Sequence, residues 1–337
     1  MITTFEAIRA YAESRNIAVT GIRDLVSACS LLARGSLKLR DLPTNDSRAL
    51  VLLWYLGLAA VYLKAERKRL TLWAAPTPLT YRVARGMLAP LILRISRWTP
   101  MRILIKYLAS RGGYATVEDV EEDLGGAVLE ATRILMPVLK LAYGRFSRPV
   151  RKPFNRHVIE AVLFKLGEEL GLLEVEKRRE ARLTELGYEL VEDSSIEIVK
   201  TMPRVPLVLL AIASIIHHSH RITLVSPWVD YEVASALAPL LEGKQLRVIS
   251  RPPHTGEHNA ALKLLAEYGD ILLYPRLHTK LALGNQALVS SANLTKTSLT
   301  RNLETGVYYR EAPPILRVHA EEIAASASRS PLQRKAS

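Results

Sequence analysis

The chain has 337 residues, of which 49% are hydrophobic and 23% are charged, and a globular chain of this length is large enough for two or three domains. Its one cysteine, Cys29, excludes internal disulfides and cysteine-based zinc sites and fits a reducing cytoplasm. The longest apolar run, about fifteen residues over 49–63, is too short to span a bilayer, and the amphipathic first helix carries Glu6 and Glu13, unlike a signal peptide. We therefore expect a cytoplasmic protein with no membrane segment.

The net charge of +13 is unevenly distributed along the chain. Residues 1–98 contain 15 Lys and Arg against 6 Asp and Glu, a net charge of +9, and the rest of the chain carries only +4. A basic surplus concentrated in one region is typical of a nucleic-acid binder. The alternative is a solvated basic surface that binds nothing.

The first region reads as helices followed by a hairpin. Helical patterns cover 3–14, 21–33 and about 45–58, and strands at 61–64 and 69–73 flank a charged turn. This order is typical of a winged helix-turn-helix, in which a helix enters the DNA major groove and the hairpin wing touches the backbone. Three basic residues of this hairpin are predicted to contact nucleic acid: Arg67, Lys68 and Arg69.

The same order recurs downstream. Helical patterns between residues 101 and 170 precede a second charged hairpin over 173–184, and each hairpin follows a Gly-Leu pair and ends in Leu-Thr. We interpret this repetition as two diverged winged-helix units, 1–98 and 99–195. Winged helices also serve as protein–protein modules, but we expect at least one of these units to bind DNA.

Within the second unit, the segment 145–156 combines basic residues with Phe and Pro. Its cations could neutralise phosphates while its aromatic rings stack on bases. The alternative is a solvated loop with two buried phenylalanines. The predicted nucleic-acid contacts are Arg148, Arg151 and Lys152.

After residue 195, strands alternate with helices, which predicts an α/β sheet with reactive side chains at its edge. Apolar β runs at 222–229, 245–250 and 270–274 alternate with helical patterns, and a last strand and helix follow at 306–310 and 318–325. The segment 326–337 is rich in Ser, Arg and Lys and is expected to be a disordered tail.

Three histidines, His217, His218 and His220, lie between a predicted helix and a strand of this region. No Cys or carboxylate stands near them in the sequence, so we expect a polar connection rather than a metal site.

The stretch 277–295 carries the chemistry of this region. It reads as an apolar strand, a two-residue Gly284-Asn285 hairpin turn, a second strand and a polar corner. Side chains two apart on a strand share a face, so His278 and Lys280 should point the same way. This pair suits a phosphate, because an imidazole can attack phosphorus while an ammonium holds the oxygens. Further donors and an acid to orient the imidazole follow: Ser291, Asn293 and Glu304.

These residues resemble the phospholipase D superfamily, whose signature is His-x-Lys, a downstream Asp and a Gly-Ser-x-Asn corner. Here His278 and Lys280 match the first motif and Ser291 and Asn293 match the corner, and the spacing from Asn293 to Glu304 is similar to that of the nuclease branch. Two positions depart from the signature, since Asn285 stands near the place of the Asp and Ser290 replaces the Gly. In the family, the Asp mainly supports the fold.

The resemblance implies an α/β phospholipase D-like C-terminal domain, a mixed sheet flanked by helices over 201–325. With the two units interpreted from the first 195 residues, the expected fold is this domain preceded by mainly α winged-helix domains. It also implies a covalent mechanism that needs no metal or other cofactor. In that mechanism, His278 attacks phosphorus while Lys280 and Asn293 hold the nonbridging oxygens. A second imidazole protonates the leaving oxygen and then activates water.

Family members with one His-x-Lys copy pair identical subunits at one site. Because this chain has a single copy, the resemblance implies a homodimer. The competing arrangement is a monomer in which His254 or His258 supplies the second imidazole.

From these observations we expect a metal-independent nuclease that binds nucleic acid, with DNA favoured over RNA as the partner. The first alternative is a non-enzymatic DNA-binding or regulatory protein whose phosphate pocket has degenerated. A phospholipid hydrolase is disfavoured because the sequence shows no lipid-facing segment and its charge indicates nucleic acid.

Overall fold

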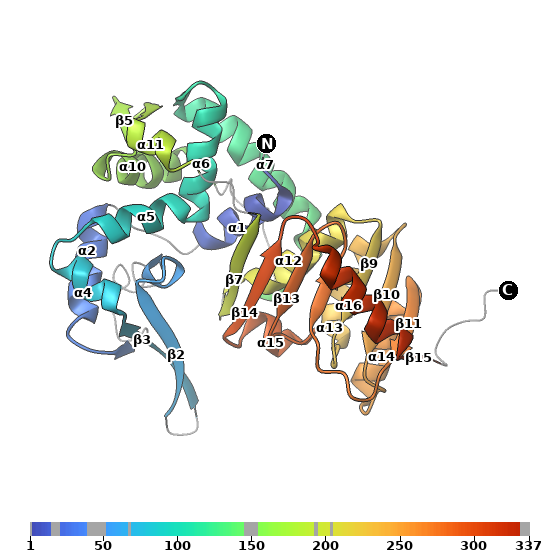
Figure 1. Ribbon diagram of the computed structural model, residues 1–337. Coiled ribbons are helices and arrows are strands. Elements are labelled where there is room, and N and C mark those ends of the chain that lie inside the picture. The colour runs from blue at the N-terminus through green and yellow to red at the C-terminus, as the bar shows by residue number, and fades with distance from the viewer. Residues whose placement is uncertain are drawn as a thin grey trace. The chain divides into compact units, whose positions relative to one another are not determined.

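The computed structural model describes the ranges 2–14, 21–38, 52–66, 69–144, 154–191, 195–202 and 205–330. The chain is a mixed α/β protein with two compact units, residues 1–131 with 150–193 and residues 132–149 with 194–337 (Figure 1). No helix in these ranges combines the length and apolar composition needed to cross a bilayer.

The first unit begins with helices and a three-stranded sheet. Phe5 and Leu25 are fully buried on the apolar sides of the first two helices, as the sequence pattern predicts. Of the helix predicted at 45–58, only residues 52–55 are described as helical. The strands pair antiparallel in the order β1-β3-β2. The elements are α1 (Thr4–Ser14), α2 (Ile22–Leu32), β1 (Leu37–Lys38), β2 (Ala59–Glu66), β3 (Arg69–Pro76), α4 (Pro78–Ala84) and α5 (Ala89–Arg97).

The same unit contains a second three-stranded sheet, in the order β4-β6-β5. In both sheets the first strand pairs with the last, and the last pairs with the middle one, so the repetition seen in the sequence extends to the strand topology. A capping box is present at Thr116, since Thr116 Oγ1 accepts from the N–H of Asp119 at 3.1 Å and Asp119 Oδ2 accepts from the N–H of Thr116 at 2.9 Å. The elements are α6 (Thr99–Ser110), β4 (Tyr114–Thr116), α7 (Val117–Ile134), α9 (Arg156–Val158), the π-helical η2 (Ile159–Phe164), α10 (Lys165–Glu169), β5 (Leu173–Glu176), β6 (Glu180–Leu183) and α11 (Glu185–Glu189).

The second unit is built on a nine-stranded mixed sheet, in the order β15-β11-β10-β9-β12-β13-β14-β7-β8. The strands β9, β10 and β11 are parallel to one another, and the other pairs are antiparallel. The strands are β7 (Ile196–Met202), β8 (Val205–Pro206), β9 (Arg221–Val225), β10 (Gln245–Ser250), β11 (Gly269–Leu273), β12 (Leu281–Leu283), β13 (Ala287–Ser290), β14 (Glu304–Tyr309) and β15 (Ser328–Arg329).

Helices flank this sheet. Helix α12 is apolar all round and its residues 207–216 are buried, as befits a helix in the middle of a core. The helix α8 packs on α13, although the boundaries drawn from the sequence place it within 99–195. The helices are α8 (Met136–Tyr143), α12 (Leu207–His218), α13 (Tyr231–Leu241), α14 (Gly256–Leu265), α15 (Lys296–Thr300) and α16 (Pro314–Ala325).

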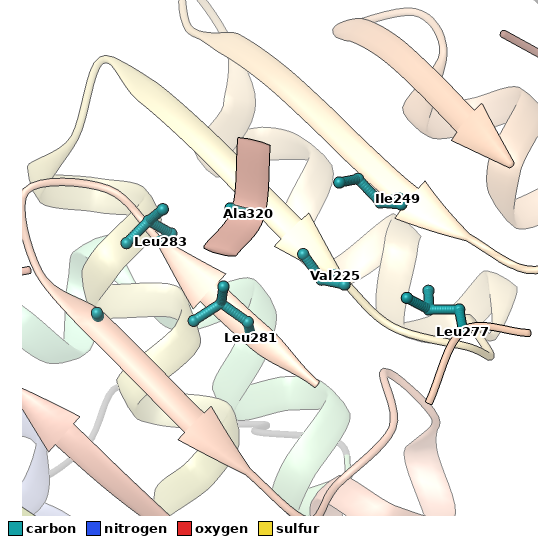
Figure 2. Close-up of a cluster of buried hydrophobic side chains, with 7 residues drawn as sticks. Val225, Ile249, Leu277, Leu281, Leu283 and Ala320 are labelled. Carbon is teal, nitrogen blue, oxygen red and sulfur yellow. The ribbon is translucent and has the colours of Figure 1, made fainter. Parts of the chain in front are cut away.

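An apolar cluster joins the sheet to α16 (Figure 2). Val225 and Ile249 come from the parallel strands, Leu281 and Leu283 come from β12, and Ala320 comes from α16. Burying these side chains stabilises the fold by about 1.5–3 kcal/mol for each large aliphatic group. The cluster fixes β12, and with it the segment that precedes β12.

Two expectations for the ends of this unit are wrong. The segment that starts at Ser326 is not disordered throughout, because β15 pairs with β11 and the N–H of Ser330 donates to Ile271 O at 2.9 Å. Residues 331–337 lie outside the described ranges. The strand β7, which pairs with β14, was not predicted because its alternating pattern begins in a segment interpreted as a domain boundary.

Candidate active site

His278 and Lys280 lie just before β12, at the end of the sheet where β9 and β10 finish. The prediction that they are part of the strand is wrong, since regular pairing begins at Leu281. Leu277 is nevertheless buried in the same cluster as Leu281, and Lys280 O accepts from the N–H of Ser290 at 3.2 Å. The apolar anchors on either side hold the short polar segment in place.

The two side chains of the His-x-Lys motif lie together, as predicted. Lys280 Nζ is 3.3 Å from His278 Nδ1 and donates to the His278 carbonyl oxygen at 2.8 Å. The imidazole is exposed to solvent and the ammonium is half-buried. Burial lowers the pKa of Lys280, the nearby charge of Arg251 lowers it further, and the charge of Glu304 opposes both. Arg251 and Glu304 therefore lie within electrostatic reach of the motif.

Glu304 and Ser291 are joined by a hydrogen bond between Oε2 and Oγ. Glu304 is the first residue of β14, and Ser291 follows β13, so the pairing of these strands brings them together. The other carboxylate oxygen accepts from Asn302 Nδ2 at 3.3 Å. Within one chain, the described contacts of Glu304 include no hydrogen bond to His278.

Asn293 is held at the same corner. The N–H of Leu294 donates to Ser226 Oγ at 3.0 Å, which ties the corner to the end of β9. Asn293 Oδ1 is buried and has no hydrogen-bond partner among the described residues. A 180° flip of the side-chain amide exchanges its oxygen and nitrogen without changing its shape, so Asn293 can present a donor at the same position. An unsatisfied buried amide costs free energy and marks a place where a ligand can bind.

Asn285, which stands near the place of the family Asp, lies away from these side chains at the β12–β13 turn. This turn has three residues, Gly284 to Gln286, instead of the two predicted, because Leu283 pairs with Ala287. The amide of Asn285 donates to His218 O at 2.8 Å. The residue supports the packing of the hairpin.

The two histidines proposed for a monomeric mechanism behave differently. His258 is buried, its Nε2 is 3.1 Å from Ser250 Oγ, and burial lowers its pKa. It is fixed in the interior, and the idea that it swings into the site is not supported by this geometry. His254 is exposed, with its ring centroid 6.1 Å from that of Trp228.

Of the six residues predicted to bind nucleic acid, the structure describes only one. Arg67, Lys68, Arg148, Arg151 and Lys152 lie outside the described residues, and Arg69 is the first residue of β3. His217 and His218 end α12 with ring centroids 4.9 Å apart. Among the described residues, no group of three or more His, Cys, Asp or Glu is arranged to hold a metal ion.

Arg251 also lies at this site and was not predicted from the sequence. This residue directly follows β10, and its Nε donates to Leu277 O at 2.7 Å, next to His278. One signal was available, because polar residues that follow parallel strands gather at one edge of the sheet.

Comparisons with known proteins were made on both sequence and structure. No family model matches the chain, and no curated protein matches it. The fold is similar to Nuc from Salmonella typhimurium, a phospholipase D family member, with 14% identity, a TM-score of 0.36 and coverage of 40% of this chain and 98% of that one. It is similar to NucT from Helicobacter pylori, with 14% identity, a TM-score of 0.35 and coverage of 40% and 99%. It is also similar to TrmBL2, an archaeal chromatin protein with a novel mode of DNA binding, with 9% identity, a TM-score of 0.32 and coverage of 91% and 94%.

Proposed function

We propose that the second unit is a metal-independent phosphodiesterase, and that its reaction is nuclease cleavage through a phosphohistidine at His278. The observation that carries the proposal is the exposed imidazole with the Lys280 ammonium 3.3 Å from its Nδ1. The imidazole is the nucleophile, and the ammonium is the fixed positive charge that a metal supplies in other phosphodiesterases.

The reaction has two displacements at phosphorus. In the first, the lone pair of His278 Nε2 forms the P–N bond, the P–O bond to the leaving group breaks, and a second imidazole gives its proton to the leaving oxygen. In the second, that imidazole takes a proton from water, the water oxygen attacks phosphorus, and the P–N bond breaks. Lys280 and Asn293 stabilise the nonbridging oxygens, and the Ser291 hydroxyl, which donates to Glu304 in the free protein, donates to them when Glu304 turns to His278.

Attack through Nε2 requires the proton of the neutral imidazole to be on Nδ1. In the free protein Nδ1 faces the Lys280 ammonium, which favours the opposite tautomer. Substrate binding therefore draws Lys280 onto a phosphate oxygen, and Nδ1 then donates to a carboxylate. Glu304 is assigned this role because its charge already acts on Lys280.

The second imidazole is proposed to be His278 of a second copy of this chain. His258 is committed to Ser250 in the interior, so it is a poor candidate for a mobile acid. His254 is the exposed alternative. A twofold axis through the site would place two imidazoles and two ammonium groups, one of each from either chain, at the reaction centre.

The proposed substrate is nucleic acid, with DNA favoured over RNA. The first 98 residues hold most of the net positive charge, and both sheets of the first unit have the strand order of a winged helix. The β5–β6 turn presents Lys177 and Arg178 to solvent with positive φ angles of 50° and 61°. Such φ values cost free energy for residues other than Gly, and strained residues of this kind cluster at functional sites. We assign the two hairpins to contacts with the phosphate backbone.

The second candidate function is a non-enzymatic DNA-binding protein. It is favoured by one observation. Glu304 hydrogen-bonds with Ser291 and Asn302, and in the described part of the chain no carboxylate hydrogen-bonds to the His278 imidazole. This protein would bind phosphate at the corner without turnover.

The test is cleavage of single- and double-stranded DNA and of bis(4-nitrophenyl) phosphate in the presence of EDTA, by the wild-type chain and by His278→Ala. The proposal predicts turnover in chelator that His278→Ala abolishes, with DNA binding unchanged. Arg276→Ala is the matched control, because Arg276 is also exposed and lies two residues from His278. Activity that EDTA removes and added metal restores, or an active His278→Ala chain, would refute the proposal.

A further inference from the structure

Arg251 is held in place by two groups. Its Nε donates to Leu277 O at 2.7 Å, and its guanidinium carbon lies 5.8 Å from the centroid of the Trp228 ring. Trp228 is half-buried, and its carbonyl oxygen accepts from Ser226 Oγ, the same hydroxyl that accepts from Leu294 next to Asn293. The arginine is therefore oriented by the same edge of the sheet that holds the catalytic motif.

The terminal nitrogens of Arg251 are free to bind a ligand. In the described part of the chain, the guanidinium has no ion pair and no hydrogen bond besides the one from Nε. The residue is half-buried, and its two Nη atoms are not among the buried polar atoms without a partner, so they reach solvent. A planar guanidinium with one edge fixed presents its other edge for bidentate binding of a phosphate.

The charges around the motif do not balance. Lys280 and Arg251 act on each other electrostatically. Among the described residues, Glu304 is the carboxylate that acts on Lys280, and it is hydrogen-bonded to Ser291 and Asn302. Keeping two cations close together costs free energy unless an anion binds them. One phosphodiester carries a single negative charge, which Lys280 and Asn293 take in the proposed mechanism. The charge of Arg251 is left for a second phosphate.

We propose that Arg251 binds the phosphodiester next to the scissile one, so that the site is built for a polynucleotide with at least two phosphates rather than for an isolated phosphodiester. This inference rests on the proposed function of His278 and names the substrate class of the same site.

The experiment compares two substrates in the full-length chain. Bis(4-nitrophenyl) phosphate has no flanking phosphate, and an octathymidylate has one on either side of each internal linkage. Arg251→Gln removes the charge but keeps an amide that can donate to Leu277 O. The matched control is Arg221→Gln, because Arg221 also bonds a neighbour through Nε, Gln245 Oε1 at 3.1 Å, at the opposite end of β9.

The expected result is a loss of about 10- to 100-fold in kcat/KM for the octathymidylate, the size of one charge-assisted hydrogen bond, with little change for the small substrate. A neutral methylphosphonate at the linkage next to the cleaved one should slow the wild-type chain by a similar factor and Arg251→Gln no further. Arg221→Gln should match the wild type on both substrates. An equal loss on both substrates, or no loss on either, would overturn the inference.

Binding separates a failure of this inference from a failure of the proposed function. A wild-type chain that cleaves neither substrate refutes the nuclease proposal. The octathymidylate affinity of His278→Ala is then measured against salt concentration with and without Arg251→Gln. The phosphate contact predicts that the magnitude of the slope of log affinity against log salt falls by about 0.7, the value for one contact to a single strand, with Arg251→Gln and is unchanged with Arg221→Gln. An unchanged slope with Arg251→Gln would overturn the inference.

Discussion

The side-chain amide of Asn285 donates a hydrogen bond to the carbonyl oxygen of His218, at the end of α12, over 2.8 Å. The N–H of Asn285 also donates to Ser219 Oγ at 2.9 Å, and its carbonyl oxygen accepts from the N–H of Ala312 at 2.8 Å. The first two bonds fasten the β12–β13 turn to the end of α12, and the third ties it to the loop between β14 and α16. An aspartate here would turn a carboxylate toward a carbonyl oxygen, so the departure from the family signature suits this local structure.

Asn285→Asp is therefore expected to lower the free energy of unfolding by about 1 kcal/mol, since it loses one hydrogen bond at an exposed position and sets two acceptors against each other. Turnover should not rise. Urea denaturation and the bis(4-nitrophenyl) phosphate assay measure the two quantities, with Asn285→Ala as the control that loses the bond without adding a charge. A more active or more stable Asn285→Asp chain would contradict this role for Asn285.

The pairing of His278 with Lys280 was predictable from the sequence, and the contacts that other segments make around this pair were not. The spacing of His278 and Lys280 predicted that their side chains lie together, and the alternation of strands and helices predicted an α/β sheet. The pairing of β13 with β14 depends on contacts between distant segments, so the sequence pattern did not show that Ser291 bonds with Glu304. The same holds for Arg251, whose contact with Leu277 crosses from one strand end to another.

The missed elements have a similar cause. The strand β7 pairs with β14 across more than a hundred residues of intervening chain, and it begins in a segment interpreted as a domain boundary. The two residues of β15 are stabilised by their pairing with β11 rather than by their own composition. In both cases tertiary pairing overrides a weak local preference.

The first hairpin is expected to contribute to nucleic-acid affinity. Charge reversal at Arg67, Lys68 and Arg69 should lower the slope of log affinity against log salt by about 2 to 3, because each lost phosphate contact removes about 0.9 from the slope. Fluorescence anisotropy on duplex DNA at several salt concentrations measures the slope. The comparison variant reverses the charges of Lys177, Arg178 and Arg179 in the second hairpin. The two variants together show which wing contacts DNA. Slopes equal to that of the wild type in both variants would show that neither wing contacts the DNA phosphates.

The dependence of kcat/KM on pH should follow the ionisation of the Lys280 ammonium. The ammonium form holds the phosphate, and burial together with the charge of Arg251 lowers the pKa of Lys280, so activity should fall on the alkaline side at a lower pH than for an ordinary lysine. Arg251→Gln removes a neighbouring cation and should move this fall to higher pH, while Glu304→Gln removes an anion and should move it to lower pH. Profiles of kcat/KM against pH for bis(4-nitrophenyl) phosphate report these shifts. Shifts in the reverse directions would contradict the assignment.

A site shared between two subunits predicts that a His278→Ala subunit inactivates the wild-type subunit with which it pairs. If both imidazoles are needed, an equal mixture of wild-type and His278→Ala chains that exchange freely should keep about a quarter of the wild-type activity, as random pairing in a twofold dimer requires. A mixture that keeps half, or full activity from a species that light scattering identifies as a monomer, would show that each chain works alone. His254→Ala then tests whether the exposed histidine supplies the second imidazole.

In the proposed mechanism phosphorus becomes bonded to His278, and trapping that bond tests the mechanism at its first step. The wild-type chain is mixed with excess bis(4-nitrophenyl) phosphate in EDTA, quenched at alkaline pH because phosphohistidine is labile in acid, digested and analysed by mass spectrometry. The proposed mechanism predicts a peptide in which His278 carries the (4-nitrophenyl)phosphoryl group left after one nitrophenolate departs, formed during turnover and absent from His278→Ala. Turnover with no modified His278 peptide, or with the phosphoryl group on another residue, would contradict it.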